Sequence, residues 1–208
     1  MSLQITTAVR KIEALKKRIK IIQGGTSASK TFSILTLLIN KAMHYNNLEI
    51  SVVAESIPHL RRGAVRDFVK IMKWTNRFID TSFNKSLLKY EFANGSFIEF
   101  FSADILYINE CNNVSFESYN ELSIRTKREI YLDFNPSNEF WVEEIKEDSE
   151  ADFIILTYKD NQALDEGIVQ QIEKNRLKAK TSTYWRNWWK VYGLGEIGML
   201  AGVIFSNF

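Results

Sequence analysis

An eight-residue segment near the start of the chain has residue types suited to holding phosphate groups. It reads Gly24-Gly25-Thr26-Ser27-Ala28-Ser29-Lys30-Thr31. Small residues let successive backbone N–H groups point at one anion. A lysine here can reach the β- and γ-phosphates of a nucleotide, and a threonine hydroxyl can bind Mg²⁺. The segment is therefore predicted to be an ATP-binding P-loop (Walker A motif), in which Lys30 acts on the phosphates and Thr31 on the metal.

The segment departs from the usual P-loop pattern at Ser29, where glycine commonly precedes the lysine. Its surroundings favour the motif, because an apolar run (Ile19–Ile22) precedes it and a helix-like run (Phe32–Met43) follows it. The start of that helix would add its positive dipole end to the phosphate site. The alternative is a Gly-Gly turn that Thr26 or Ser27 caps before an ordinary helix.

ATP hydrolysis also needs a neighbouring strand that ends in acidic residues, one carboxylate to bind Mg²⁺, directly or through water, and another to polarise the attacking water. The best candidate is the apolar run Ile105–Ile108, which Asn109 and Glu110 follow. Ligands bind at the carboxyl ends of strands in open α/β sheets. Glu110 is therefore predicted to be the catalytic base. Asn109 is predicted to bind the metal through its uncharged amide oxygen, more weakly than aspartate would. The alternative is a capping pair after a core strand.

A third strand-like run ends at Leu132-Asp133-Phe134-Asn135-Pro136. In a parallel sheet its tip would lie near the γ-phosphate, so Asn135 is predicted to sense the phosphate and couple its state to the rest of the domain. An ordinary strand-ending turn is the alternative, because Asn-Pro favours turns. Candidates for the charge-stabilising arginine of phosphoryl transfer, in cis or across a subunit interface, are Arg61, Arg62 and Arg66. The alternative is that each is an ordinary surface arginine. The two histidines, His44 and His59, have no evident catalytic partner in the sequence.

The elements that would position these residues alternate between strand and helix, which favours a largely parallel sheet with helices on both faces. Strands are predicted over 18–23, 50–54, 105–108, 130–134 and 153–158, and helices over 6–17, 30–45, 60–74, 140–147, 166–179, 183–192 and from 115. Asn94-Gly95 between two strand-like runs predicts a hairpin at one edge of the sheet.

The stretch from Ser96 to Asn109 contains two strand-like segments with only Ala103-Asp104 between them. A single strand of this length would span roughly 45 Å. Two adjacent parallel strands would need a crossover of about a dozen residues or more. A segment between Phe101 and Ile105 is therefore predicted to be absent from the sequence, with a sharp bend at Asp104 as the alternative.

Composition limits the class of protein. The chain has 208 residues, of which 45% are hydrophobic and 25% charged, as expected for one globular α/β domain. No apolar stretch is long enough to span a bilayer. The single cysteine fits a reducing cytoplasm. The net charge is only +2, but basic residues cluster near both ends of the chain. These clusters could contact a phosphate backbone or form solvated helix faces.

Together these motifs resemble the ATPase domain of the large terminase subunit of tailed bacteriophages. The phosphate loop is similar to a variant found in that family, and 108–113 is similar to its second nucleotide motif. Three further segments match features of the family. Residues 134–136 match its coupling motif, 158–161 match a typical turn, and 192–198 match the segment that leads to its linker. The resemblance covers most of the chain.

The resemblance implies a RecA-like (ASCE) P-loop NTPase fold with ATP and Mg²⁺ as ligands. It also implies a motor that drives double-stranded DNA into an empty procapsid in the host cytoplasm. The implied partners are the small terminase subunit, the portal and further copies of the chain in a ring, which is expected to be a pentamer. Lys30 and Thr31 carry over as phosphate and metal contacts, Glu110 as the catalytic base and Asn135 as the coupling residue.

Some positions depart from the family pattern. Thr26 stands where many members have a sensor arginine, and Asn109 replaces the commoner aspartate. We expect residues 1–17 to form an N-terminal helix and residues from about 193 to begin a linker. In the family such a linker leads to a nuclease domain, which we do not expect among these residues, so nuclease activity is not expected of this chain. Two other functions remain open at this point: a helicase- or recombination-type ATPase, and a nucleotide-binding scaffold that does not hydrolyse.

Overall fold

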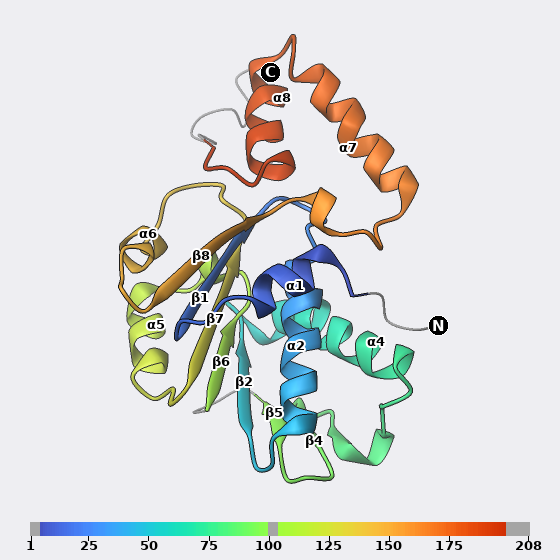
Figure 1. Ribbon diagram of the computed structural model, residues 1–208, viewed down its shortest axis with the longest axis vertical. Helices are drawn as coiled ribbons and strands as arrows, with labels where there is room; N and C mark the ends of the chain where they lie inside the picture. The colour runs from blue at the N-terminus through green and yellow to red at the C-terminus, as the bar shows by residue number, and fades with distance from the viewer. Residues whose placement is uncertain (1–4, 100–103, 199–208) are drawn as a thin grey trace.

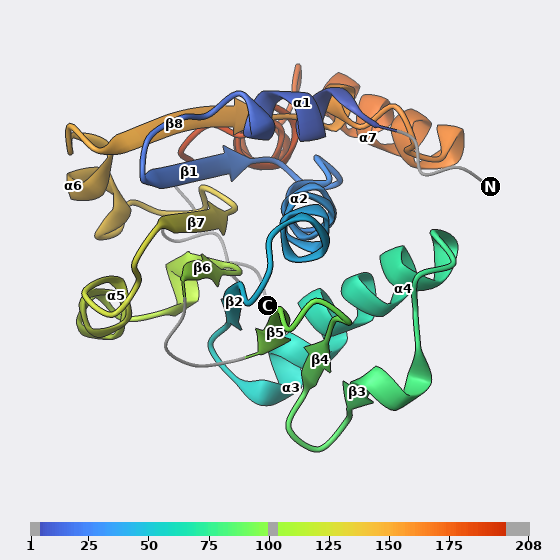
Figure 2. The same cartoon turned by 60° about the horizontal axis from the view of Figure 1, so that its bottom comes forward.

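The computed structural model describes residues 5–99 and 104–198, which form a mainly parallel sheet between two layers of helices (Figures 1 and 2). Within these residues the sheet has eight strands in the order β3-β4-β5-β2-β6-β7-β1-β8. The strands are β1 (Ile19–Gly24), β2 (Glu49–Val53), β3 (Phe83–Asn84), β4 (Lys89–Glu91), β5 (Phe97–Glu99), β6 (Ile105–Ile108), β7 (Glu129–Phe134) and β8 (Ala151–Leu156). The predicted α/β fold with a largely parallel sheet is confirmed.

The helices lie in the predicted parts of the chain, but the N-terminal helix predicted over 6–17 ends already at Glu13. The α-helices are α1 (Thr7–Glu13), α2 (Lys30–His44), α3 (Ile57–Leu60), α4 (Arg66–Trp74), α5 (Phe116–Ser123), α6 (Val142–Lys146), α7 (Glu166–Lys178) and α8 (Thr183–Trp188). Short 3-10 turns lie at η2 (Asp80–Ser82), η3 (Cys111–Asn113) and η4 (Tyr158–Asp160), and π-helical turns at η1 (Arg61–Val65) and η5 (Trp189–Gly193). None of the helices in the described residues is long and apolar enough to cross a membrane.

Alternate residues of the central strands fill two separate cores, because successive side chains of a strand point to opposite faces. Tyr107 of β6 and Tyr131 of β7 lie in the larger core, under α1, α2 and α4. Leu106 and Leu132 lie in the second core, under α5 and α6. Figure 2 shows these two helix layers on opposite sides of the sheet. This alternation decides which polar residues at the strand ends face α2.

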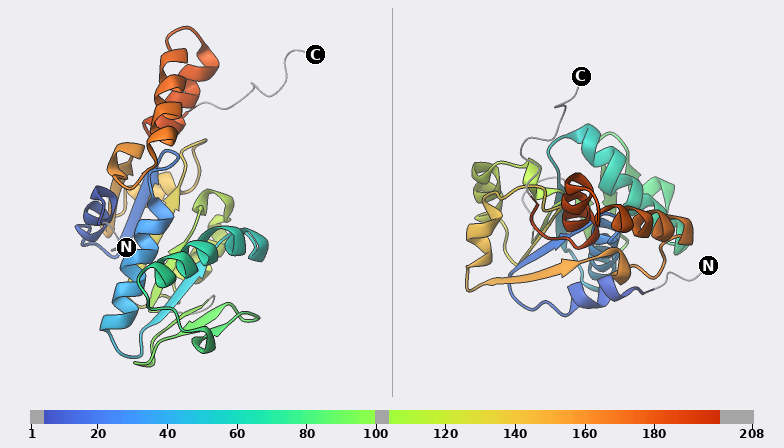
Figure 3. Two further views of the ribbon diagram at one scale, coloured as in Figure 1. Left: turned by 90° about the vertical axis from the view of Figure 1, so that its right-hand side faces the viewer. Right: turned by 90° about the horizontal axis from the view of Figure 1, so that it is seen from above.

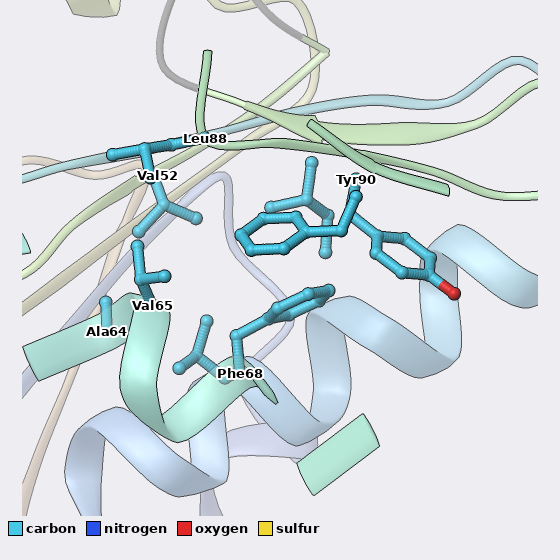
Figure 4. Close-up of a pocket in the computed structure, with 9 residues that line it drawn as sticks. Val52, Ala64, Val65, Phe68, Leu88 and Tyr90 are labelled. Atoms are coloured by element: carbon cyan, nitrogen blue, oxygen red, sulfur yellow. The ribbon is translucent and has the colours of Figure 1, made fainter. Parts of the chain in front are cut away.

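The predicted edge hairpin is present. Strand β4 pairs antiparallel with β5, and Gly95 adopts the left-handed conformation that the turn requires, with φ of 81°. The hairpin packs on the helix that follows β2 around a small apolar cavity of about 20 Å³ (Figure 4). Its lining includes Val52, Ala64, Val65, Phe68, Leu88 and Tyr90. The hairpin therefore extends the larger core beyond the parallel strands.

The stretch from Ser96 to Asn109 forms two strands that are not neighbours. Both β5 and β6 pair parallel with β2, one on each side of it. The register places Glu99 opposite Ser51 and Ile105 opposite Ile50, so β5 ends at the level where β6 begins. The predicted missing segment would fall between Phe101 and Ile105, and because residues 100–103 lie outside the described residues, it stays a prediction.

The last helices stand beyond the carboxyl ends of the strands, where Figures 1 and 3 show α7 and α8 projecting above the sheet. The chain after α8 returns to the phosphate loop. The Thr26 N–H donates to the Tyr192 carbonyl at 3.0 Å, and the Gln23 side-chain amide donates to the Gly195 carbonyl at 2.6 Å. The C-terminal part of the described chain thus supports the end of β1.

Candidate nucleotide-binding site

The loop between β1 and α2 has the geometry of an anion cradle. Ser27 and Ser29 adopt left-handed backbone conformations, with φ of 59° and 63°. Within the described residues, the N–H groups of Ser27, Ala28 and Ser29 have no backbone acceptor. The first N–H groups of α2 lack partners inside the helix, as in any α-helix. The loop therefore presents a set of free donors at the positive end of a helix dipole.

Gly24 and Gly25 allow this loop to pack closely against other backbone segments. A Cβ atom on Gly24 would lie 2.5 Å from the Leu156 carbonyl oxygen, and one on Gly25 would lie 2.1 Å from the Tyr192 carbonyl oxygen. Both distances are too short for any side chain. The two glycines thus fix the loop between β8 and the segment that follows α8.

Lys30 is directed into the loop rather than into solvent. Its Nζ donates to the carbonyl oxygens of Gly24 and Gly25, each at 3.1 Å, and to Asn135 Oδ1 at 2.7 Å. Burial lowers the pKa of Lys30, and the negative charges of Asp133 and Glu110 oppose that shift. The ammonium is therefore held where an additional anion would stabilise its charge.

A buried hydrogen-bond network joins Thr31 to the ends of β6 and β7. The Thr31 hydroxyl donates to Asp133 Oδ2 at 3.4 Å and accepts from Asn109 Nδ2 at 3.1 Å. Asp133 Oδ1 accepts from the Tyr107 hydroxyl, Asn109 Nδ2 and the Glu110 N–H, each at 3.0 Å. Burial, and next the charge of Asp133, raise the pKa of the Tyr107 hydroxyl well above its usual value, so it remains a donor.

Glu110 follows β6 and lies at the edge of this network. Its side chain is 42% exposed, and its Oε2 lies 3.0 Å from His59 Nε2 and accepts from Asn113 Nδ2 at 3.4 Å. Because its own N–H donates to Asp133, which also contacts Thr31, the backbone of Glu110 is tied to the phosphate loop. The accessible carboxylate can reach a water molecule, as a general base must.

The structure brings most of the predicted site residues together. The loop 24–31, Asn109, Glu110 and Asn135 meet at the carboxyl ends of β1, β6 and β7. The three candidate arginines are exposed on η1 and the start of α4, and among the described residues none of them has a hydrogen bond to that network. The Arg62 guanidinium donates to the Pro58 carbonyl at 3.3 Å, and Arg66 contacts the neighbouring Asp67.

Two residues of the site were not recognised from the sequence. Asp133 was seen only as part of a strand-ending turn, yet it accepts hydrogen bonds from both neighbouring segments. His59 had no evident partner, and this interpretation was wrong, because its ring contacts Glu110. The signal that could have found Asp133 is its two-residue spacing from Tyr131, which places both on one face of β7, at the end of that strand.

The donor set fits a nucleotide and a divalent cation. The loop offers unpaired N–H groups and an ammonium for phosphates, and Thr31 and Asp133 offer hydroxyl and carboxylate oxygens, which Mg²⁺ prefers. Within the described residues, no group of three or more His, Cys, Asp or Glu side chains could hold a metal.

The fold and the site together define a RecA-like P-loop NTPase domain, in which β7 lies between the strand of the phosphate loop and the strand of the predicted base. The sequence model of the phage terminase large subunit matches residues 16–194. The chain therefore belongs to the phage terminase large subunit family. Among curated proteins, none gives a significant match.

Solved structures of large terminases share this fold. The large terminase of a thermophilic bacteriophage superposes with a TM-score of 0.77 at 16% identity, covering 99% of this chain and 57% of that one. The bacteriophage HK97 large terminase gives a TM-score of 0.68 at 12% identity, covering 91% of this chain and 48% of that one. The chain thus spans about half the length of these proteins.

A third structure matches over nearly its whole length. The ATPase domain of the large terminase of Thermus phage P74-26 gives a TM-score of 0.67 at 10% identity, covering 91% of this chain and 92% of that domain. The first of these three terminases, from the thermophilic bacteriophage, has also been solved in complex with ADP and with ATP-γ-S. At these identities the likeness establishes the fold and leaves the roles of individual residues to the geometry of this chain.

Proposed function

We propose that this chain is the ATPase domain of a DNA-packaging motor, which binds ATP with Mg²⁺ and hydrolyses it to move double-stranded DNA into a procapsid. The observation that carries the proposal is the convergence of Lys30, Thr31, Glu110 and Asn135 from separate segments on one strand-end site. Family membership and the nucleotide complexes of the thermophilic bacteriophage terminase support it.

Each of these side chains has a definite task in that reaction. Lys30 would exchange its contacts with the Gly24 and Gly25 carbonyls for phosphate oxygens, and the loop N–H groups would bind the same phosphates. Glu110 would orient the attacking water and accept its proton. Bound Mg²⁺ neutralises charge on the β- and γ-phosphates.

Asn135 is suited to couple the phosphate site to the rest of the domain. Its Oδ1 accepts from Lys30 Nζ at 2.7 Å, so movement of the lysine towards a phosphate would break or shift this contact. Asn135 also begins the turn after β7, whose backbone leads directly to α6. A change at the phosphate would thus reach a different layer of the fold.

The remaining partners follow from the family. We propose that the domain acts at the procapsid portal in the host cytoplasm, together with a small terminase subunit and other copies of the chain in a ring. The exposed positions of Arg61, Arg62 and Arg66 suit a contact with a neighbouring subunit, which would supply the charge-stabilising arginine in trans.

Steady-state ATPase assays and nucleotide titrations of two variants test this assignment. Lys30→Ala should lose both nucleotide binding and hydrolysis, because it removes the phosphate contact. Glu110→Gln should retain binding and lose hydrolysis by about 100-fold or more, since only the base is removed. Lys70→Ala and Glu117→Gln, at exposed positions on α4 and α5, are the matched controls. Undiminished hydrolysis in both site variants would refute the assignment.

A further inference from the structure

The end of β6 carries an amide where the metal site needs a carboxylate, and the neighbouring strand carries a buried carboxylate at the same level. Ile108 pairs with Leu132 in the parallel register of β6 and β7, so Asn109 and Asp133 are the next residues of the two strands. Both are almost completely buried, at 2% and 1% exposure. They lie side by side on the face covered by α2.

The amide of Asn109 points its nitrogen, not its oxygen, at the centre of the site. Nδ2 donates to Asp133 Oδ1 at 3.0 Å, to the Tyr107 hydroxyl at 3.1 Å and to Thr31 Oγ1 at 3.1 Å. The Oδ1 atom faces η1, where a Cβ on Gly63 would lie 3.5 Å from it. An amide turned the other way would place its oxygen against the Asp133 carboxylate, which is unfavourable.

The Asp133 carboxylate is held firmly at one oxygen and loosely at the other. Among the described residues, Oδ1 accepts three hydrogen bonds, whereas Oδ2 accepts a single long one, at 3.4 Å, from the Thr31 hydroxyl. A buried carboxylate oxygen with a single weak donor has acceptor capacity left. That oxygen lies beside the hydroxyl predicted to contact the metal.

We propose that Asp133, not Asn109, is the acidic residue that holds the Mg²⁺ of the bound nucleotide, directly or through a water molecule. Asn109 is then a positioning residue: together with Tyr107 it fixes Asp133 Oδ1 and leaves Oδ2 facing Thr31. The carboxylate of the metal site thus lies on β7, and not after β6 where the sequence pattern places it. This inference rests on the proposed nucleotide-binding function.

The metal dependence of nucleotide affinity tests the inference without relying on catalysis. ADP is titrated into the chain in Mg²⁺ buffer and in EDTA buffer, and the ratio of the two dissociation constants is the readout. In Asp133→Asn we expect the tightening by Mg²⁺ to fall about 10-fold or more, with affinity in EDTA retained. In Asn109→Ala we expect a smaller fall, because the ligand itself remains.

An exchange of the two side chains provides the rescue. Aspartate and asparagine have the same shape, so the double variant Asn109→Asp/Asp133→Asn keeps a hydrogen bond between them and returns a carboxylate to Thr31. It should recover most of the tightening by Mg²⁺ that Asp133→Asn loses. If Asp133→Asn does not fold, as judged by thermal unfolding, Asn109→Ala decides: it should keep most of the tightening by Mg²⁺ if Asp133 is the ligand, and lose it if the Asn109 amide is.

Two results would overturn the inference. Unchanged tightening by Mg²⁺ in Asp133→Asn would show that this carboxylate serves the fold alone, and a larger loss in Asn109→Ala than in Asp133→Asn would return the ligand role to the amide. If the proposed nucleotide-binding function itself is wrong, the result is different: the parent chain would then bind ADP in neither buffer, and both proposals would be refuted.

Discussion

Glu110 adopts a left-handed backbone conformation with φ of 54°, which is unfavourable by about 1–2 kcal/mol for a residue with a side chain. Its contacts explain how that conformation persists. Its N–H donates to Asp133 Oδ1, and its carboxylate contacts His59 Nε2 at 3.0 Å. His59 itself lies on α3, with its Nδ1 3.7 Å from Glu55 Oε2. The orientation of the Glu110 carboxylate, the predicted base, thus depends on His59, which comes from the helix after β2.

We expect His59→Ala to lower kcat for ATP hydrolysis by about 10-fold while the ADP dissociation constant stays the same. The reason is that the contact of the imidazole with the Glu110 carboxylate, contributing roughly 1.4 kcal/mol, orients the base without touching the nucleotide. Steady-state kinetics and an ADP titration measure the two quantities. His59→Asn, which can still donate, should recover part of the rate.

His44→Ala is the matched control for this prediction. His44 lies at the other end of α2 and packs against Tyr45, so its removal should leave kcat unchanged. An equal effect of both histidine variants, or a His59→Ala variant with an unaltered rate, would contradict the positioning role.

The elements of this fold could be predicted well because each depends on local sequence. The Ile105–Ile108 strand has the predicted bounds, and α2 begins at Lys30 and ends one residue before the predicted end. The predicted helix over 60–74 begins at Ile57 and includes the π turn Arg61–Val65, and β8 begins two residues early. These differences reflect tertiary packing, which shifts element ends without changing their type.

Site residues could be predicted only where a local pattern marks them. Lys30 and Thr31 belong to a contiguous motif, and Glu110 and Asn135 each follow an apolar run, so local spacing alone predicted that they lie at the site. Asp133 and His59 join the site through the pairing of β7 with β6 and the position of α3 after β2. Such contacts depend on strand order and register, which the sequence of one strand does not specify.

The contact between the phosphate loop and the segment after α8 leads to a prediction for Gly25→Ala. The new Cβ would lie 2.1 Å from the Tyr192 carbonyl oxygen, which belongs to backbone and cannot move freely. The loop must shift and lose the Thr26–Tyr192 hydrogen bond. We expect a loss of about 1–3 kcal/mol in the free energy of unfolding, and a weaker ADP affinity, measured by thermal unfolding and titration.

Gly63→Ala provides the comparison within the same chain. Its Cβ would lie 3.5 Å from Asn109 Oδ1, an ordinary contact distance, and alanine is the better helix former. This variant should be as stable as the parent or slightly more so. A Gly25→Ala chain that is equally stable and binds ADP normally would show that the close approach does not constrain the loop.

At the scale of the whole molecule, charge is arranged at both ends of the sheet. The amino end of β7 carries Glu129, which accepts from Lys41 Nζ at 2.7 Å and from the Tyr131 hydroxyl at 2.7 Å, and lies 3.3 Å from Lys20 Nζ. Lys20 comes from β1 and Lys41 from the last turn of α2. One carboxylate therefore joins two strands and the helix that follows the phosphate loop, at the end of α2 opposite the nucleotide site.

This cluster makes the free energy of unfolding depend on pH, and the sign of that dependence follows from the pKa of Glu129. Burial pushes the pKa of Glu129 up, but the hydrogen bonds from Lys41 and Tyr131 and the charge of Lys20 together hold it below its ordinary value of 4.5. A carboxylate whose pKa is lowered by folding stabilises the fold above its unfolded pKa, and this contribution is lost as the pH falls through the folded pKa.

Glu129→Gln should therefore destabilise the chain by about 2 kcal/mol near neutral pH, because it leaves Lys20 and Lys41 without their partner. The difference from the parent should shrink below about pH 4.5, because protonated glutamate then resembles glutamine. Chemical denaturation at several pH values measures it, with Glu121→Gln on the exposed side of α5 as the control. A difference that stays constant from pH 7 to pH 3 would mean that packing at this position, rather than the charge of Glu129, joins α2 to the two strands.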